Sequence, residues 1–194
     1  NNPHHIAGAI DSDGADKGAR FLQLCDAFDL PLISIMDCPG IMVGPEVEKT
    51  ALVRHCARLF NTGANLSVPM FGLIIRKAYG LGVQAMCGGS SKVPFFTAAW
   101  PTAEFAGMAI EGSVKLAYRS EFQEMESAEE RIRVFTEKVD HAYDRAKAIN
   151  SAEFYGIEDV IDPASSRDWI VAGLNGIPAP PPRTSKKRPY IDTW

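Results

Sequence analysis

The stretch that decides the fold is LIIRKAYGLGVQAM, residues 73–86. Its apolar, β-branched start, together with Phe71, is long enough for a buried strand. Two glycines, Gly80 and Gly82, then flank Leu81, and the residues after Gly82 suit a helix. The stretch therefore predicts a strand, a tight turn that contains glycine, and the start of a helix.

Such a turn offers backbone N–H groups to a ligand. The first N–H groups of a helix have no partner within the helix, and the helix dipole adds a partial positive charge there. These groups can hold a phosphate or an oxyanion. In the alternative interpretation, Gly80 and Gly82 only permit positive φ in a strand–helix connection. The stretch alone leaves both interpretations open.

The bulk composition is that of an ordinary globular domain. The chain has 194 residues, 46% of them hydrophobic and 23% charged, with a formal net charge of −4. A mildly acidic chain has no general attraction to nucleic acid or to an anionic membrane, and no apolar run approaches the length of a membrane span. Because the chain starts at Asn1 without a signal segment, we expect a fragment or a processed chain.

The four cysteines are Cys25, Cys38, Cys56 and Cys87. None forms a C-x-x-C pair, and no cysteine or histidine spacing resembles a zinc site. We therefore expect no metal, and free thiols in the reducing cytoplasm.

Apolar runs and periodic segments alternate along the first hundred residues. Expected strands cover 6–10, 32–36, 68–75, 93–99 and 157–161, and expected helices cover 15–29, 45–61, 103–108, 113–118, 127–150 and 165–174. Parallel strands need helical crossovers, so this order predicts an α/β domain with mostly parallel pairing. The domain is expected to span 1–176, and the Pro-rich, basic segment 177–194 is expected to be an extended tail that packs on a neighbour or is mobile.

Helix signals support these assignments. Asp13 is the expected N-cap of the helix over 15–29, and Ser127 with Glu130 matches a capping box. The helix over 127–150 is expected to bury one stripe, made of Ile132, Phe135, Val139, Tyr143, Ala146 and Ile149.

Side-chain chemistry is sparse. The chain has no G-x-x-x-x-G-K-[ST], H-E-x-x-H or G-x-S-x-G motif. Cys38 follows a strand but has no visible base, so a packed thiol is the simpler interpretation. Arg76 and Lys77 stand at the mouth of a buried strand, where they could attract an anion or form a structural salt bridge. This composition suits a reaction that must stabilise a negative oxygen while a cofactor carries the reactive base.

Nine short blocks, taken in order, resemble the C-terminal half of the carboxyltransferase β-type subunit of biotin-dependent acyl-CoA carboxylases, such as propionyl-CoA carboxylase. The resemblance covers nearly the whole chain, and the order and spacing of the blocks make it specific. The blocks are Asn1-Asn2-Pro3, Asp11-x-Asp13 with Ala15-Asp16-Lys17, Cys25-Asp26-Ala27-Phe28, Asp37-x-Pro39-Gly40, Arg54-His55, Val68-Pro69, Arg76-Lys77-Ala78-Tyr79-Gly80, Trp100-Pro101 and Glu111-Gly112.

The resemblance implies an α/β, crotonase-like fold of repeated ββα units, here with a long C-terminal helix and an extended tail. It implies transfer of CO₂ from carboxybiotin, carried by a partner domain, to the α-carbon of an acyl-CoA. The implied partners are an N-terminal carboxyltransferase half that binds most of the coenzyme A, a biotin carboxylase and a biotin carrier, in a homo-oligomeric dimer or hexamer. The isolated fragment is expected to be inactive because half of the site is missing.

The resemblance also places the site. The Leu81 and Gly82 amides are implied to form an oxyanion hole for the biotin ureido oxygen, with Gly80 shaping the turn. Gly40, Ile41 and Met42 are implied to wall the biotin channel. Relatives usually read Gly, Ala, Tyr and Asp at positions 81–84, so Leu81 must keep a negative φ for its amide to serve.

Two of those changes, Val83 and Gln84, lie where relatives line the acyl end of the pocket. Propionyl-CoA is therefore not assumed as the substrate. Two further functions remain open: the α-type subunit of a biotin-dependent acyl-CoA decarboxylase, and a non-catalytic assembly module of the same fold.

Overall fold

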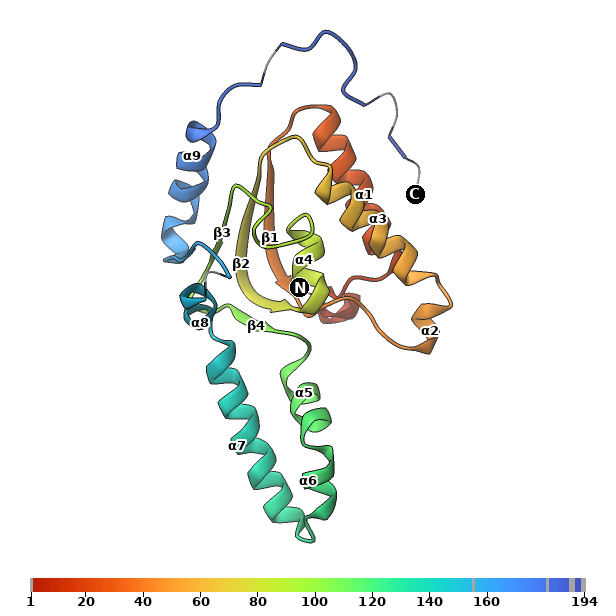
Figure 1. Cartoon of the computed structure of the whole chain (residues 1–194), viewed down its shortest axis with the longest axis vertical. Helices are drawn as coiled ribbons and strands as arrows, with labels where there is room; N and C mark the ends of the chain where they lie inside the picture. Colours follow the sequence, from red (N-terminus) through yellow and green to blue (C-terminus); the bar gives the residue numbers. More distant parts are fainter. Residues whose placement is uncertain (1, 155, 181, 189–190, 193–194) are drawn as a thin grey trace.

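The computed structural model describes residues 2–154, 156–180, 182–188 and 191–192. Asn1 of the first matching block, and positions 181, 189–190 and 193–194 of the tail, lie outside these residues. Within them the chain forms a parallel sheet with helices on both faces (Figure 1). The predicted α/β class with parallel pairing is confirmed.

The sheet is organised around β2. The strands in the described part of the chain are β1 (Leu32–Cys38), β2 (Met70–Tyr79), β3 (Phe96–Ala99), β4 (Glu104–Ala106) and β5 (Asp159–Val160). The order is β1-β2-β3-β5, and β4 pairs with the last part of β2. Every one of these pairings is parallel. β2 therefore contacts three other strands and carries the centre of the domain.

The helices occupy the connections between strands. Their bounds are η1 Pro3–Gly8, α1 Ser12–Ala27, α2 Pro45–Glu48, α3 Leu52–Ala64, α4 Gly80–Met86, α5 Ile110–Ala117, α6 Arg119–Glu124, α7 Ala128–Ala146, α8 Ala148–Glu153, η2 Pro163–Ser165 and α9 Ser166–Gly176.

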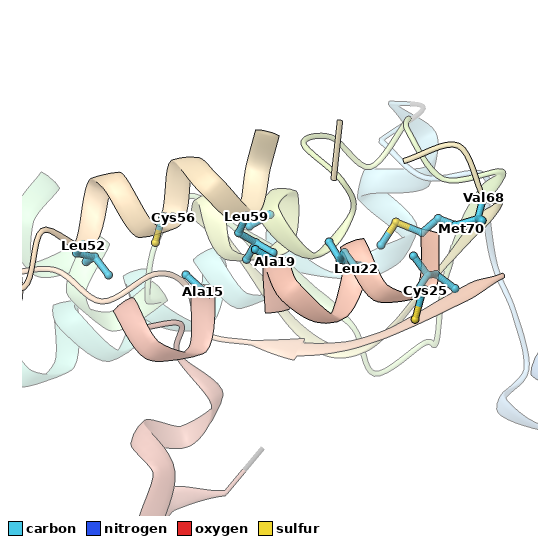
Figure 2. Packing of buried hydrophobic residues seen from close by; sticks show 11 residues of the cluster. Ala15, Ala19, Leu22, Cys25, Leu52, Cys56, Leu59, Val68 and Met70 are labelled. Atoms are coloured by element: carbon cyan, nitrogen blue, oxygen red, sulfur yellow. The ribbon is translucent and has the colours of Figure 1, made fainter. Parts of the chain in front are cut away.

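The core has a layer on each face of the sheet. Figure 2 shows α1 and α3 packed side by side, with Ala19 of α1 next to Leu59 of α3 and Ala15 nearest Cys56. Small side chains on α1 allow the two helices to approach closely while the larger ones fill the space above the strands. On the opposite face, α9 covers β2 and β3, where Phe71 and Phe96 are buried.

Helices α5, α6 and α7 form an arm that extends away from the sheet (Figure 1). Because little of the arm packs on the domain, the predicted stripe of the long helix is largely not buried. Ala146, near the root, is buried, whereas Ile132 of α7 is 67% exposed and Ile149, which lies in α8, is 55% exposed.

The N-terminal segment differs from the prediction, because η1 replaces the strand expected over 6–10. Asn2 caps η1 with its side chain and Pro3 occupies the first turn, so the segment starts as a helix. The β-pairing here is an isolated bridge between Ile10 and Ile41.

Helix boundaries also differ. Asp11, not Asp13, caps α1 by accepting the N–H of Gly14 at 2.8 Å. The helix expected over 45–61 is divided into α2 and α3 at Ala51, whose φ is +57°. The predicted cap at Ser127 is confirmed.

The segment expected as a helix over 103–108 is the strand β4. β2 continues to Tyr79, four residues beyond the predicted end, and its extension pairs with β4 through Lys77 and Glu104. The short helix expected over 113–118 starts earlier, at Ile110. The long helix expected over 127–150 is interrupted at Lys147, because Ala148 donates its N–H to the Ala103 carbonyl at 3.0 Å.

The described part of the tail contains neither helix nor strand and returns to α1. Arg183 binds Asp29, Lys187 lies 3.2 Å from Asp26, and Arg188 lies 2.7 Å from Asp26. Burial raises the pKa of Asp26, but hydrogen bonds from Ser67 and from the two tail cations outweigh this effect and lower the pKa to about 2. Arg183, Lys187 and Arg188 of the tail are therefore held by carboxylates of the same chain.

Candidate active site

The segments predicted to form the site meet at the carboxyl edge of the sheet. β1 ends at Cys38 and β2 ends at Tyr79, and the ends of parallel strands lie at one edge. A Cβ atom placed on Gly82 would lie 2.6 Å from Cys38 Sγ and 2.8 Å from Gly40 Cα. The structure therefore brings Gly82 and Gly40 into direct contact, and only glycine at position 82 allows it.

Gly80 makes the turn from β2 into α4. Its φ is +56°, and a Cβ atom there would lie 2.8 Å from the carbonyl oxygen of Gly107, just after β4. Both the backbone conformation and the close contact require glycine. Tyr79 is the N-cap of α4, so Gly80, Leu81 and Gly82 are its first three helical residues. N–H groups at these positions have no acceptor within the helix.

The side chains of α4 differ in exposure. The φ of Leu81 is negative, as its amide requires in order to serve in the predicted oxyanion hole. The Leu81 side chain is 58% exposed. Gln84 is exposed. Val83 is half-buried and packs against the core cluster that contains Met36 and Ile74. Of the two residues predicted for the acyl pocket, Gln84 is therefore the more accessible.

The loop after β1 is anchored on both sides. Gly40 has a φ of +129° and accepts the N–H of Ile10 at 3.0 Å. Ile41 and Met42 are half-buried and pack against the core between α1 and α3. Part of each side chain therefore supports the loop, and the remaining part faces away from this core.

Cys38 is a packed thiol beneath this contact. Its side chain is buried and donates to the Gly40 carbonyl at 3.5 Å. Burial raises the pKa of the thiol above its ordinary value. A neutral, buried thiol is a poor nucleophile, which supports the packing interpretation.

Arg76 forms the structural salt bridge that the sequence left open. Its Nε and Nη2 atoms lie 3.1 and 2.8 Å from Asp37 Oδ2. The N–H of Lys77 also donates to Asp37, at 3.1 Å. The hydrogen bond to Asp37 raises the pKa of Arg76. Asp37 thus ties the end of β1 to β2.

Sequence reasoning missed a hydrogen-bonded pair beside the turn. Tyr79 is 2% exposed, and its hydroxyl donates to Glu104 Oε2 at 2.6 Å. The sequence predicts a helix over 103–108, so nothing in the expected elements places Glu104 near β2. The position of Tyr79, immediately before the glycine turn, was the available signal.

Neither a metal-ligand cluster nor a membrane-spanning helix occurs among the described residues. No group of three or more His, Cys, Asp or Glu side chains is placed to hold a metal ion. Among the helices described, none combines the length and the apolar character needed to cross a bilayer.

Comparisons with known families and proteins agree with one another. The carboxyl transferase domain model matches residues 1–187. The chain is 33% identical over 174 residues to the carboxyltransferase subunit of propionyl-CoA carboxylase from Haloferax mediterranei, covering 90% of this chain and 33% of that protein. It is 36% identical over 176 residues to the alpha subunit of methylmalonyl-CoA decarboxylase from Propionigenium modestum, with coverage of 90% and 33%. The chain thus spans about a third of the length of these curated relatives.

Solved structures give the same result. A single-chain, multi-domain long-chain acyl-CoA carboxylase matches with a TM-score of 0.79 and 48% identity, covering 89% of this chain and 17% of that one. The transcarboxylase 12S hexamer with methylmalonyl-CoA bound matches with a TM-score of 0.81 and 29% identity, covering 100% and 37%. The predicted resemblance and the crotonase-like fold class are confirmed.

Proposed function

The chain belongs to the carboxyl transferase domain family, and we propose that the complete protein moves a carboxyl group from carboxybiotin to the α-carbon of an acyl-CoA. The observation that carries the proposal is the contact between Gly82 and Gly40. It sets the first turn of α4 against the loop after β1, at the edge of the sheet where α/β domains bind ligands.

The residues present fit the ureido group of biotin. A ureido oxygen accepts hydrogen bonds, and the first turn of α4 provides backbone donors at Leu81 and Gly82. When bound, biotin supplies the carboxyl group and the base. Leu81 and Gly82 stabilise negative charge on the ureido oxygen, and Gly80 sets the direction of their N–H bonds. Gly40, Ile41 and Met42 border the bound ring.

We place the acyl chain of the substrate near Val83 and Gln84. The 48% identical relative is a long-chain acyl-CoA carboxylase, whereas the propionyl-CoA carboxylase relative is 33% identical. This difference favours an acyl chain longer than propionyl. Most of the coenzyme A is assigned to the N-terminal carboxyltransferase half.

The proposed assembly includes a biotin carboxylase, a biotin carrier and further copies of the same subunit. One relative is described as a hexamer and another as a single multi-domain chain, so both arrangements occur among similar proteins. The proposed location is the cytoplasm, where the four free, buried cysteines would stay reduced.

The decarboxylase direction is the second candidate. It is favoured by the relative from Propionigenium modestum, which is named as a decarboxylase subunit and shares 36% identity. Dependence of activity on sodium, together with a membrane pump as partner, would select this direction. A non-catalytic assembly module is disfavoured by the negative φ of Leu81, which keeps its amide at the first turn of α4.

The test assembles the complete protein with its biotinylated partner, ATP and labelled bicarbonate, and offers acetyl-, propionyl- and longer acyl-CoAs. Gly82→Pro is unsuitable, because any Cβ at position 82 collides with Cys38. Leu81→Pro removes one N–H at an exposed position, and Leu81→Ala is the matched control that keeps it. Loss of one oxyanion donor typically lowers kcat by about 10²–10³-fold. The proposal fails if no acyl-CoA is labelled, or if the proline and alanine variants transfer equally well.

A further inference from the structure

Two tyrosine–glutamate pairs lie where the arm joins the sheet. The Tyr79 hydroxyl donates to Glu104 Oε2 at 2.6 Å, and the Tyr143 hydroxyl donates to Glu111 Oε1 at 2.7 Å. Tyr79 is the last residue of β2 and is buried. Tyr143 is half-buried on α7 beside the cluster that contains Tyr79, and its hydrogen bond to Glu111 is exposed. The two pairs have the same chemistry, but of the two tyrosines only Tyr79 directly precedes Gly80 of the turn.

The hydrogen bond between Tyr79 and Glu104 joins β2 to β4, the strand that lies against the turn at Gly80. β4 has three residues, and its pairing with β2 ends at Tyr79 opposite Ala106. The next residue, Gly107, places its carbonyl oxygen 2.8 Å from where a Gly80 Cβ would be. A strand this short has few ladder hydrogen bonds, so the hydrogen bond of the Glu104 side chain adds a further link between β4 and β2.

Packing and charge keep the Tyr79 phenol neutral, so that it donates to Glu104. Tyr79 packs with Ile110 of α5 and Ala146 of α7, so the arm covers its ring. Burial raises the pKa of Tyr79, and the hydrogen bond to Glu104 raises it further. The phenol therefore remains a neutral donor at working pH. Lys77 Nζ lies 5.9 Å from the centroid of the Tyr79 ring, so a cation stands beside the phenol.

We infer that Tyr79 and Glu104 are positioning residues for carboxyl transfer: their hydrogen bond holds β4 against the turn at Gly80 and so sets the direction of the Leu81 and Gly82 N–H bonds. This inference rests on the proposed function. Neither residue is required to touch the substrate or biotin. Their effect is on the alignment of donors, which catalysis depends on more steeply than binding does.

The experiment uses the complete protein assembled with its biotinylated partner. Tyr79→Phe should lower kcat by about tenfold to a hundredfold, as expected for a small misalignment of the reacting groups. KM for the acyl-CoA should change by less than about twofold, because the lost interaction acts in the transition state. Tyr143→Phe removes the same hydroxyl from the exposed pair, and its kcat should stay within about twofold of the unaltered protein.

Glu104 provides the rescue test. Glu104→Gln retains an oxygen that accepts from Tyr79 and should keep most of kcat, whereas Glu104→Ala should resemble Tyr79→Phe. Thermal unfolding of each variant separates misfolding from misalignment, because kcat is counted per folded molecule.

The outcomes separate this inference from the proposed function. If the unaltered complex labels no acyl-CoA, the proposed function fails and the inference fails with it. If the unaltered complex is active and Tyr79→Phe matches its kcat, the inference alone is wrong. It is also wrong if Glu104→Gln loses as much activity as Glu104→Ala, or if Tyr143→Phe loses as much as Tyr79→Phe.

Discussion

Replacing Gly82 with alanine tests the contact on which the candidate site depends. The added Cβ would lie 2.6 Å from Cys38 Sγ and 2.8 Å from Gly40 Cα. Ordinary contacts between such atoms are about 3.5–4.0 Å, so the two segments must separate by about 1 Å. One of the opposing atoms belongs to the backbone, which cannot rotate away as a side chain can.

The displacement allows the loss of unfolding free energy and the loss of transfer rate to be estimated. Overpacking of this kind costs about 1–3 kcal/mol of unfolding free energy. A misplacement of about 1 Å at a catalytic group can reduce the rate by about 10²-fold. Gly82→Ala should therefore retain a cooperative fold of lower stability and lose most of its carboxyl transfer.

The assay combines urea unfolding with carboxyl transfer by the assembled complex. Gly107→Ala is the matched control: this glycine also lies beside the turn, but a Cβ there would meet nothing within 4 Å. The control should unfold and transfer like the unaltered protein. Equal stability and equal transfer in Gly82→Ala would show that the two backbones do not touch, and the site as described would be wrong.

Two further predictions concern stability. The pKa of Asp26 is raised by burial but lowered overall, to about 2 from 3.8, by hydrogen bonds from Ser67 and the basic tail. The carboxylate therefore contributes about 2 kcal/mol above pH ~3.8, and this is lost as the pH falls toward 2; unfolding of Asp26→Asn in urea at several pH values should lack that dependence. On α9, a Cβ at Gly173 would lie 2.6 Å from the ring of Phe71, whereas one at Gly176 would have its nearest neighbour at 4.0 Å. Gly173→Ala should lower the unfolding free energy by about 1–3 kcal/mol, Gly176→Ala should not, and an unchanged midpoint for the first variant would contradict the packing of α9.

Much of the architecture is local in origin and was predictable. The apolar runs at β1, β2 and β3 and the helices α1 and α9 lie where periodicity places them, because each run is long enough for burial to outweigh weak propensities. The strand–turn–helix around Gly80 was also predicted, since glycine punctuates the chain where an apolar run stops. Asn2 and Pro3 are a local signal for a helix start, and the prediction of a strand over 6–10 did not take it into account.

The sequence by itself determined the family, the α/β class and the glycines of the turn, because these depend on local pattern and on the order of short blocks. Only the tertiary structure decided that β4 is a strand, since its three residues become extended by pairing with residues 27 positions earlier in the chain. The contact of Gly82 with Gly40 and the bond between Tyr79 and Glu104 are likewise long-range. Such contacts form only when distant segments are brought together, and no local propensity encodes them.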